Sequence, residues 1–263
     1  MKNLNSPRRC KSSIKGRRIL INFSKNCCQR SQPKNCDTAL ETGGFDVCIM
    51  YNENVLDEDF KKFNDRILST KTGGGLWLWK PYIILKTMLA MKDDDVLMYT
   101  DSGTHFIDNV DHAHICLMQQ RQKDVVVFSD SHPEYQLTKP DAFILMGLDP
   151  SNPKYSQSNQ LIAAFFITRK SFKSIKFLSE FLTYAQDYRI ISNDKSTFGK
   201  EPAGFRGHRN DQSIESLLSK KYDFEIWPDP SQYGEDGFNF NLRKSEQFAL
   251  INRTFFAHTR DKS

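Results

Sequence analysis

A carboxylate at the end of a predicted strand is the clearest sign of chemistry in this sequence. Asp101 follows the short apolar run at residues 96–99, Val-Leu-Met-Tyr, which is typical of a buried parallel strand. In open α/β sheets ligands bind outside the carboxyl ends of the strands, so an acid there can hold a divalent cation against a diphosphate. Asp and Ser after a strand are also common turn formers, so Asp101, Ser102 and Gly103 could equally form the next turn.

A glycine- and tryptophan-rich block precedes this strand. The glycines at residues 73–75 have no side chains, so the backbone there can turn sharply or pass close to a ligand. Apolar residues then recur at roughly helical spacing, and Pro81 fits a first helical turn, where no amide partner is lost. The block predicts a tight turn followed by a helix of about ten residues.

A second acid, Asp211, stands in the run HRNDQS at residues 208–213. It opens a predicted helix whose apolar stripe contains Ile214, Leu217 and Leu218. Its carboxylate could simply favour the positive end of that helix. The basic residues before it could orient the helix or approach a phosphate, although basic residues in such a place are usually solvated.

Strand-like apolar runs alternate with helical patterns along the chain, which predicts one α/β domain. We expect strands at residues 18–23, 45–50, 96–99, 124–128, 161–168 and 222–227. Helices are expected at residues 57–69, 112–122, 139–147 and 171–191 and from residue 211. Turn formers predict surface loops at residues 149–158 and 193–207, the second of them mobile enough to act as a lid.

Composition describes a soluble globular protein. The chain has 263 residues, of which 38% are hydrophobic and 26% charged. No apolar run approaches the roughly 20 residues that a membrane helix needs, and the amino terminus lacks the apolar stretch of a secretory signal. We therefore expect a cytoplasmic protein.

Charge is unevenly distributed. Residues 1–36 contain ten Lys or Arg and no acid, which leaves 27 basic and 32 acidic residues in the remainder. We expect residues 1–17 to be a basic flexible arm and residues 18–263 to be the domain. Such an arm could touch an anionic membrane surface or nucleic acid, or remain solvated. The acidic body argues against a broad nucleic-acid-binding surface.

The six cysteines give no pattern for a metal. They show no paired CxxC spacing for zinc, and adjacent Cys27 and Cys28 have an awkward geometry for a disulfide. We expect reduced, mostly structural thiols.

Several motifs taken in order resemble nucleotide-sugar glycosyltransferases of the GT-A fold. They are GGGLWLWKPYIIL, a strand ending in YTDSG, SNQLIAAFFI, HRNDQSI and a closing His-Thr-Arg, and they cover residues 64–260. The tryptophan-rich and HRNDQS blocks are similar to a bacterial and viral group of transferases, with a looser likeness to the glycogenin and galactosyltransferase type. The resemblance implies a single GT-A-like domain with a mixed, mainly parallel sheet flanked by helices. It also implies transfer of a sugar from a nucleotide diphosphate sugar, UDP-linked by preference, to a hydroxyl on a glycan, lipid-linked or protein acceptor.

The same resemblance implies a metal site. In that class an Asp-x-Asp motif holds manganese or magnesium and the ribose, and a late histidine often completes the metal shell. Asp101 matches the first acid, whereas Gly103 replaces the second. Asp101 and His258 would then remain as protein ligands of Mn²⁺ or Mg²⁺, and one or two carboxylates can suffice when phosphate oxygens and waters supply the rest. A lone late histidine is more often a surface or core residue.

Roles in donor binding and catalysis follow from the resemblance as well. Lys80 resembles a family lysine that offsets diphosphate charge as the sugar–phosphate bond breaks, or it is an ordinary lysine whose stem lies along apolar surface. Asp211 and Gln212 match an Asp-Gln pair beside the donor sugar and the acceptor hydroxyl, where a carboxylate acts as a base or stabilises positive charge on the sugar carbon. The implied donor-binding residues are Lys80, Asp101, Ser102, Gly103 and Arg209.

Other classes of protein compete with this reading. A nucleotidyltransferase or phosphatase could share an α/β sheet with an acid at a strand end, but the sequence has no GxxxxGK[ST] loop and no dense acidic cluster. A degenerate transferase fold that binds sugar or nucleotide without turnover would also explain Gly103, because fold does not imply function.

Overall fold

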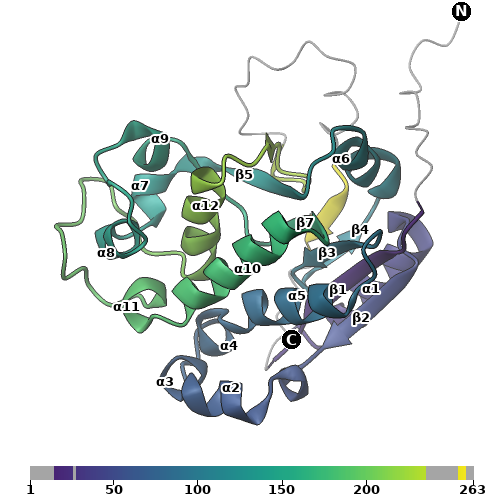
Figure 1. The fold of residues 1–263 in the computed structure, drawn as a ribbon, viewed down its shortest axis with the longest axis horizontal. Helices are drawn as coiled ribbons and strands as arrows, with labels where there is room; N and C mark the ends of the chain where they lie inside the picture. Colours follow the sequence, from purple (N-terminus) through teal and green to yellow (C-terminus); the bar gives the residue numbers. More distant parts are fainter. Residues whose placement is uncertain (1–14, 26–27, 235–253, 259–263) are drawn as a thin grey trace, which may run out of the picture.

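The structure is a computed structural model that describes residues 15–25, 28–234 and 254–258. A seven-stranded sheet in the order β2-β1-β3-β7-β5-β6, with β8 beside β5, forms its centre (Figure 1). Strands β6 and β7 run in the opposite direction to the other five, so the sheet is mixed and mostly parallel. The strands are β1 Arg18–Phe23, β2 Val47–Tyr51, β3 Val96–Thr100, β4 Thr104–Phe106, β5 Val125–Pro133, β6 Asn159–Leu161, β7 Phe165–Arg169, β8 Ile226–Trp227 and β9 Phe256–His258.

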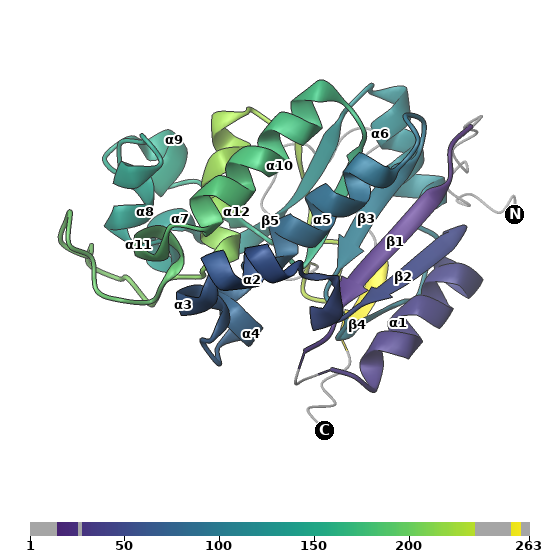
Figure 2. The same cartoon turned by 60° about the horizontal axis from the view of Figure 1, so that its bottom comes forward.

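Helices cover both sides of this sheet. They are α1 Ser31–Thr38, α2 Glu58–Phe63, α3 Asp65–Leu68, α4 Gly73–Leu76, α5 Trp79–Ala90, α6 Cys116–Gln120, α7 Glu134–Leu137, α8 Pro140–Leu145, α9 Pro153–Ser156, α10 Phe172–Ala185, α11 Tyr188–Ile191 and α12 Asp211–Lys221. Helices α5, α10 and α12 lie on one side of the sheet, and α1 lies on the other (Figure 2). None of the helices in the described part of the chain has the length and apolar character needed to cross a membrane.

Strand β3 supplies both hydrophobic cores. Leu97 and Tyr99 belong to the cluster under α5, α10 and α12, whereas Val96 and Met98 belong to the cluster on the opposite face. Successive side chains of a strand point to opposite faces, so a fully apolar run is what a strand buried on both sides requires. The prediction of a buried strand that ends just before Asp101 is therefore confirmed.

The predicted strand at residues 161–168 is wrong as one element. It divides into β6, which pairs with β5, and β7, which pairs with both β3 and β5. Between them the carbonyl oxygens of Ala163 and Ala164 accept hydrogen bonds from Lys80 Nζ and the Asp101 amide, both at 3.0 Å. These two carbonyl groups bond to Lys80 and Asp101 at the point where the strand is interrupted.

Two predicted helices are also divided. The helix expected at residues 57–69 breaks into α2 and α3 at Asn64, whose side-chain amide donates to the carbonyl oxygen of Phe60. Asn competes in this way with regular helical bonding. The helix expected at residues 171–191 ends with α10, and Asp187 caps the separate helix α11 by accepting from the Arg189 amide at 2.9 Å.

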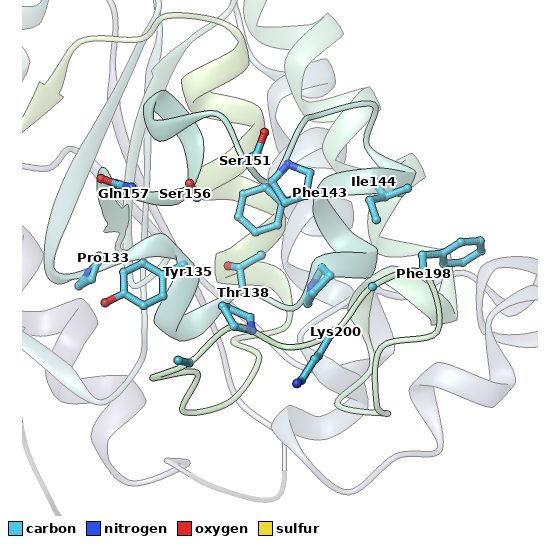
Figure 3. A pocket seen from close by; sticks show the side chains of 15 residues that line it. Pro133, Tyr135, Thr138, Phe143, Ile144, Ser151, Ser156, Gln157, Phe198 and Lys200 are labelled. Carbon is cyan, nitrogen blue, oxygen red and sulfur yellow. The ribbon is translucent and has the colours of Figure 1, made fainter.

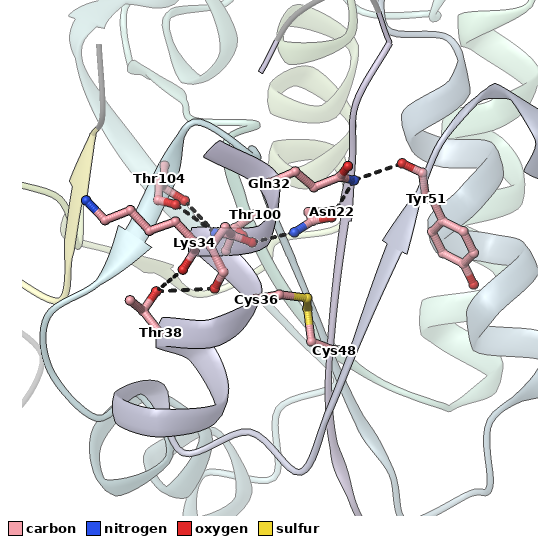
Figure 4. The surroundings of a disulfide bond; sticks show 10 residues. Asn22, Gln32, Lys34, Cys36, Thr38, Cys48, Tyr51, Thr100 and Thr104 are labelled. Atoms are coloured by element: carbon pink, nitrogen blue, oxygen red, sulfur yellow. Dashed lines mark hydrogen bonds between the residues drawn. A yellow bond between two sulfur atoms is a disulfide. The ribbon is translucent and has the colours of Figure 1, made fainter. Parts of the chain in front are cut away.

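The prediction of reduced thiols is wrong. Cys36 on α1 and Cys48 on β2 form a disulfide with a Cα–Cα separation of 5.6 Å (Figure 4), and Cys116 is also disulfide-bonded. The sequence could not reveal this pair, because it depends on α1 packing against β2. Disulfides persist in oxidising environments, so this pair lends no support to the predicted cytoplasmic location, which stays a prediction.

Near the disulfide, a buried polar network ties α1 to the ends of β1 and β3 (Figure 4). The side-chain amide of Asn35 donates to the hydroxyls of Thr100 and Thr104, at 3.0 and 3.1 Å. Asn22 donates to the Asn35 side-chain oxygen at 2.6 Å. Buried amides and hydroxyls must find partners, and here they hold together the strand ends on which Asp101 lies.

Candidate active site

The glycine run turns the chain sharply into α5. Gly73, Gly74 and Gly75 have φ values of +59°, +60° and +109°, a region that favours glycine. A Cβ on Gly75 would lie 2.8 Å from the Cα of Leu68, so the close approach of the two segments also requires glycine. The predicted turn and helix are both confirmed, and Lys80 lies in the first turn of that helix.

Trp79 fixes the start of α5. Its ring stacks on that of Phe23 at 4.0 Å between centroids, and its indole N–H donates to the Gly73 carbonyl oxygen at 2.9 Å. One aromatic side chain therefore joins the end of β1, the glycine turn and the helix that carries Lys80. Such stacking helps to hold the neighbouring lysine in a single place.

Lys80 joins the two acids singled out in the sequence. Its Nζ lies 2.7 Å from Asp211 Oδ2 and 3.6 Å from Asp101 Oδ1. The lysine side chain is only 4% exposed, so this is a buried ion pair rather than an extended solvated side chain. Burial alone would lower the pKa of Lys80, but Asp211 and Asp101 raise it above its usual value, so the ammonium is charged.

Asp101 is the accessible member of the group. Its side chain is 42% exposed, and its Oδ1 accepts a hydrogen bond from the Tyr99 hydroxyl at 2.7 Å. Tyr99 is buried, and burial raises the pKa of its hydroxyl well above the ordinary value, with Asp101 adding to the effect. A permanent donor thus orients a carboxylate that solvent or a ligand can reach.

Asp211 is almost fully buried at the first position of α12. Burial raises the pKa of this carboxyl to about 6, although Lys80 acts in the opposite direction. Glu215 follows one turn later, is buried too, and its Oε1 has no hydrogen-bond partner. Burial raises the pKa of Glu215 well above its usual value, which favours the neutral form of this carboxyl. Glu215 is not among the residues that the sequence motifs singled out, although it follows Asp211 at i+4 spacing on a predicted helix.

Gln212 belongs to a buried polar chain behind Asp211. Its side-chain N–H group donates to Gln160 Oε1 at 2.7 Å, and Gln160 donates in turn to Glu134 Oε1 at 3.0 Å. Glu134 is paired with Lys220 on α12 at 2.5 Å. No sequence signal could have identified Gln160, Glu134 and Lys220, because they come from separate elements.

The other predicted donor-binding residues take different positions. Ser102 is buried, and its hydroxyl donates to the Phe23 carbonyl oxygen at 2.9 Å, so it holds the loop against β1. Gly103 lies between it and β4. Arg209 is exposed, and its backbone amide donates to the Leu137 carbonyl oxygen at 3.0 Å. His208 is buried, which lowers its pKa to about 3, so it is a neutral core residue.

His258 lies on β9, which pairs with β4 just after the end of β3 and Asp101. Strands β4 and β9 pair side by side with Thr104 opposite His258, three residues after Asp101 (Figure 1). The His258 ring lies 6.0 Å from the ring of Phe165 and 5.3 Å from that of Tyr233. Within the described residues no group of three or more His, Cys, Asp or Glu side chains is arranged to hold a metal ion. The remaining residues of the closing motif, Thr259 and Arg260, lie outside the described residues.

Comparison with known proteins identifies the fold but no sequence family. No protein-family model and no curated protein matches the sequence. Among solved structures, the crystal structure of mouse xyloside xylosyltransferase 1 in its apo form matches with a TM-score of 0.50 and 9% identity. The match covers 94% of this chain and 98% of that chain. Identity this low shows the fold alone, which confirms the predicted mixed α/β, glycosyltransferase-like domain.

Proposed function

We propose that this chain is a glycosyltransferase that moves a sugar from a nucleotide diphosphate sugar, UDP-linked by preference, to an acceptor hydroxyl. The observation that carries the proposal is the buried Lys80, which joins Asp101 at the end of β3 to Asp211 at the start of α12. Ligands of open α/β sheets bind at this edge. A buried carboxyl with a raised pKa, such as that of Asp211 beside the Lys80 ammonium, is typical of a functional site.

Each residue has a role that its surroundings support. Asp101 is accessible and lies on the donor side, where it contacts the ribose and the diphosphate. Lys80 supplies a fixed positive charge as the bond between the sugar carbon and the phosphate oxygen breaks and its electron pair passes to the leaving diphosphate. Asp211, with a pKa of about 6, is ionised at neutral pH. It either takes the proton of the acceptor hydroxyl or stabilises positive charge on the sugar carbon.

A divalent cation could also bind at this site. Asp101 and His258 are the two candidate protein ligands, and the described residues provide no third one. These ligands fit Mn²⁺ or Mg²⁺ only if the donor phosphates and waters complete the shell, as they do at many magnesium sites. The bound cation would neutralise diphosphate charge.

Two observations favour a second function. Gly103 stands where a second acid would be, and Asp211 is already paired with Lys80 and shielded from solvent. A protein that keeps the fold and binds a sugar or nucleotide without turnover would have these features. Donor binding without transfer or hydrolysis is the result that would favour it.

Calorimetric titration tests the proposal. UDP, GDP and CDP are titrated into the wild type and the Asp101→Ala variant, with and without Mn²⁺, and hydrolysis of the matching nucleotide sugars is followed in parallel. Tight binding of one nucleotide and slow hydrolysis of its sugar, both lost in the variant, are expected. Equal binding and turnover by Asp101→Ala would refute the assignment. Membrane contact by the basic arm needs a separate test, because residues 1–14 lie outside the described residues.

A further inference from the structure

A large cleft lies apart from the Lys80 ion pairs, between α7, α8, α9 and the loop that precedes α12 (Figure 3). Its volume of about 960 Å³ is near the upper end of the range for ligand pockets. The residues that line it come from three short helices, from the turns beside them and from the 198–203 segment of the loop. None of these residues has a role in the proposed chemistry.

The outer wall of the cleft is fixed in place. The Asp141 carboxylate accepts hydrogen bonds from the backbone amides of Thr197 and Phe198, at 2.9 and 2.8 Å. Gly199 lies so close to α8 that a Cβ on it would be 3.1 Å from Pro140. The loop expected to act as a mobile lid is therefore tethered to α8 at residues 197–199, and the cleft is preformed. A preformed site binds without a large ordering cost.

The lining combines rigid apolar rings with a few polar groups, of which one is a lysine (Figure 3). The apolar part consists of Pro133, Tyr135, Pro140, Phe143, Ile144, Pro150, Phe198, Pro202 and Ala203. The polar side chains are those of Thr138, Ser151, Ser156, Gln157 and Lys200. No Asp or Glu is among the described residues that line the cleft.

This chemistry distinguishes between the possible acceptors. An oligosaccharide presents many hydroxyls, and a cleft with so few polar side chains and no carboxylate would leave most of them without a partner. The hydroxyls of Ser151 and Ser156 already donate to Asp149 and to the Asn152 carbonyl oxygen, but a prenyl chain would leave the side-chain amide of Gln157 without a partner when it covered it. An extended polypeptide suits both the apolar and the polar part of the lining, because its apolar side chains can pack on the rings and its backbone amides can bond to the polar groups. Extended peptides dock in aromatic-lined grooves for this reason.

Hydrogen bonds connect the cleft to the candidate active site. Thr138 lines the cleft, and its Oγ1 accepts from Gln160 Nε2 at 3.1 Å. Gln160 Oε1 accepts from Gln212, the neighbour of Asp211, at 2.7 Å. The loop that forms the outer wall leads towards α12, and α12 also packs against α8 and α9, which line the cleft.

We propose that the cleft binds an extended segment of a protein acceptor and directs one of its hydroxyl side chains towards Asp211. This inference rests on the proposed transferase function for its catalytic part, whereas peptide binding itself does not depend on turnover. Phe198 and Tyr135 of the cleft are the aromatic residues on which the peptide packs.

Peptide binding is tested with an array of short synthetic peptides of varied sequence, each with a central Ser, Thr or Tyr. Labelled wild-type protein is compared with Ala203→Trp, which fills the cleft, and with Phe198→Ala, which removes an anchor. Matched controls are Ala90→Trp at the end of α5 and Phe172→Ala at the start of α10, because both residues are exposed and lie outside the cleft. Affinity for the best peptides should fall about tenfold or more in the two cleft variants, the loss expected from one aromatic anchor, and stay unchanged in the controls.

A prenyl phosphate and a linear oligosaccharide serve as competing probes. The inference is overturned if no peptide binds, if Ala203→Trp binds peptides as the wild type does, or if only a competing probe is lost in that variant. Donor hydrolysis, measured on the same proteins, should remain at the wild-type rate in both cleft variants. Absent donor hydrolysis in the wild type counts against the proposed function alone, so the two failures can be told apart.

Discussion

Lys80 Nζ lies 2.7 Å from Asp211 Oδ2 in the interior of the protein, and this contact joins helix α5 to helix α12. Neither charge can be satisfied by water, because both side chains are about 5% exposed or less. Each partner therefore keeps the other charged, and Asp101 shares the same ammonium. Both the chemistry proposed for the site and the stability of the fold therefore depend on the ammonium group of Lys80.

Replacing Lys80 by Met should destabilise the protein strongly. Two carboxylates would lose their cation, and removing one partner of a buried pair typically costs about 3–5 kcal/mol. Chemical denaturation of the wild type and of Lys80→Met measures the change in the free energy of unfolding. Lys86→Met is the matched control on the same helix, because the Lys86–Asp57 pair is exposed and should matter much less. Equal stability of the two variants would contradict a buried ion pair.

Restoring charge balance should recover part of that loss. The double variant Lys80→Met/Asp211→Asn contains neither member of the 2.7 Å pair, so no uncompensated charge remains at position 211. We expect it to be more stable than Lys80→Met alone. A double variant as unstable as the sum of its two single changes would mean that the side chains do not interact.

Activity should depend on the ionisation of Asp211. Its pKa of about 6 means that the carboxylate forms as pH rises through 6, so kcat/KM should increase there and level off above it. Asp211→Asn should lower kcat about 10²- to 10⁴-fold and remove that step from the pH profile. The exposed acid Asp223, just after α12, provides the control Asp223→Asn, which should change neither. An unchanged acid limb in Asp211→Asn would exclude Asp211 as the titrating group.

Stability should fall in mild acid because of His208. Burial lowers the pKa of its imidazole from 6.5 to about 3, so the unfolded chain binds a proton that the folded protein does not. The contribution is therefore fully present above pH 6.5 and lost as pH falls from there towards 3, by up to about 1.4 kcal/mol per pH unit. Denaturation of the wild type and of His208→Gln between pH 7 and pH 4 measures it. The wild type should lose more stability than the variant over this interval, and parallel curves would mean that His208 is accessible.

The Cys36–Cys48 disulfide should stabilise the domain. It closes a short loop between α1 and β2, and removing such a bond typically costs about 2–4 kcal/mol. The double variant Cys36→Ser/Cys48→Ser should unfold at a lower denaturant concentration than the wild type under oxidising conditions. In the presence of a reductant the difference should shrink. A variant as stable as the oxidised wild type would show that the bond adds nothing to the fold.

Local patterns in the sequence were enough to predict several elements of the fold. A fully apolar run specifies a strand buried on both faces, which identified β3 and the carboxylate of Asp101 at its end. The glycines at residues 73–75 required an unusual backbone, and the apolar stripe after Asp211 defined the start of α12. These features depend on neighbours in the chain, so side-chain periodicity and backbone sterics are enough to predict them.

Which of these residues meet depends on the packing of segments that are distant in the sequence. Lys80 is separated in sequence from both acids, and no local pattern shows that its ammonium is shared between them. Contacts between distant segments also explain three other features that the sequence did not predict. They are the Cys36–Cys48 disulfide, the hydrogen-bonded chain from Gln212 to Glu134 and the division of residues 161–168 into two strands. Burial and charge pairing arise from contacts between distant segments, and they set the pKa of Asp211 as well. Sequence therefore predicted where acids could act, and packing determined which of them is buried, paired or open to a ligand.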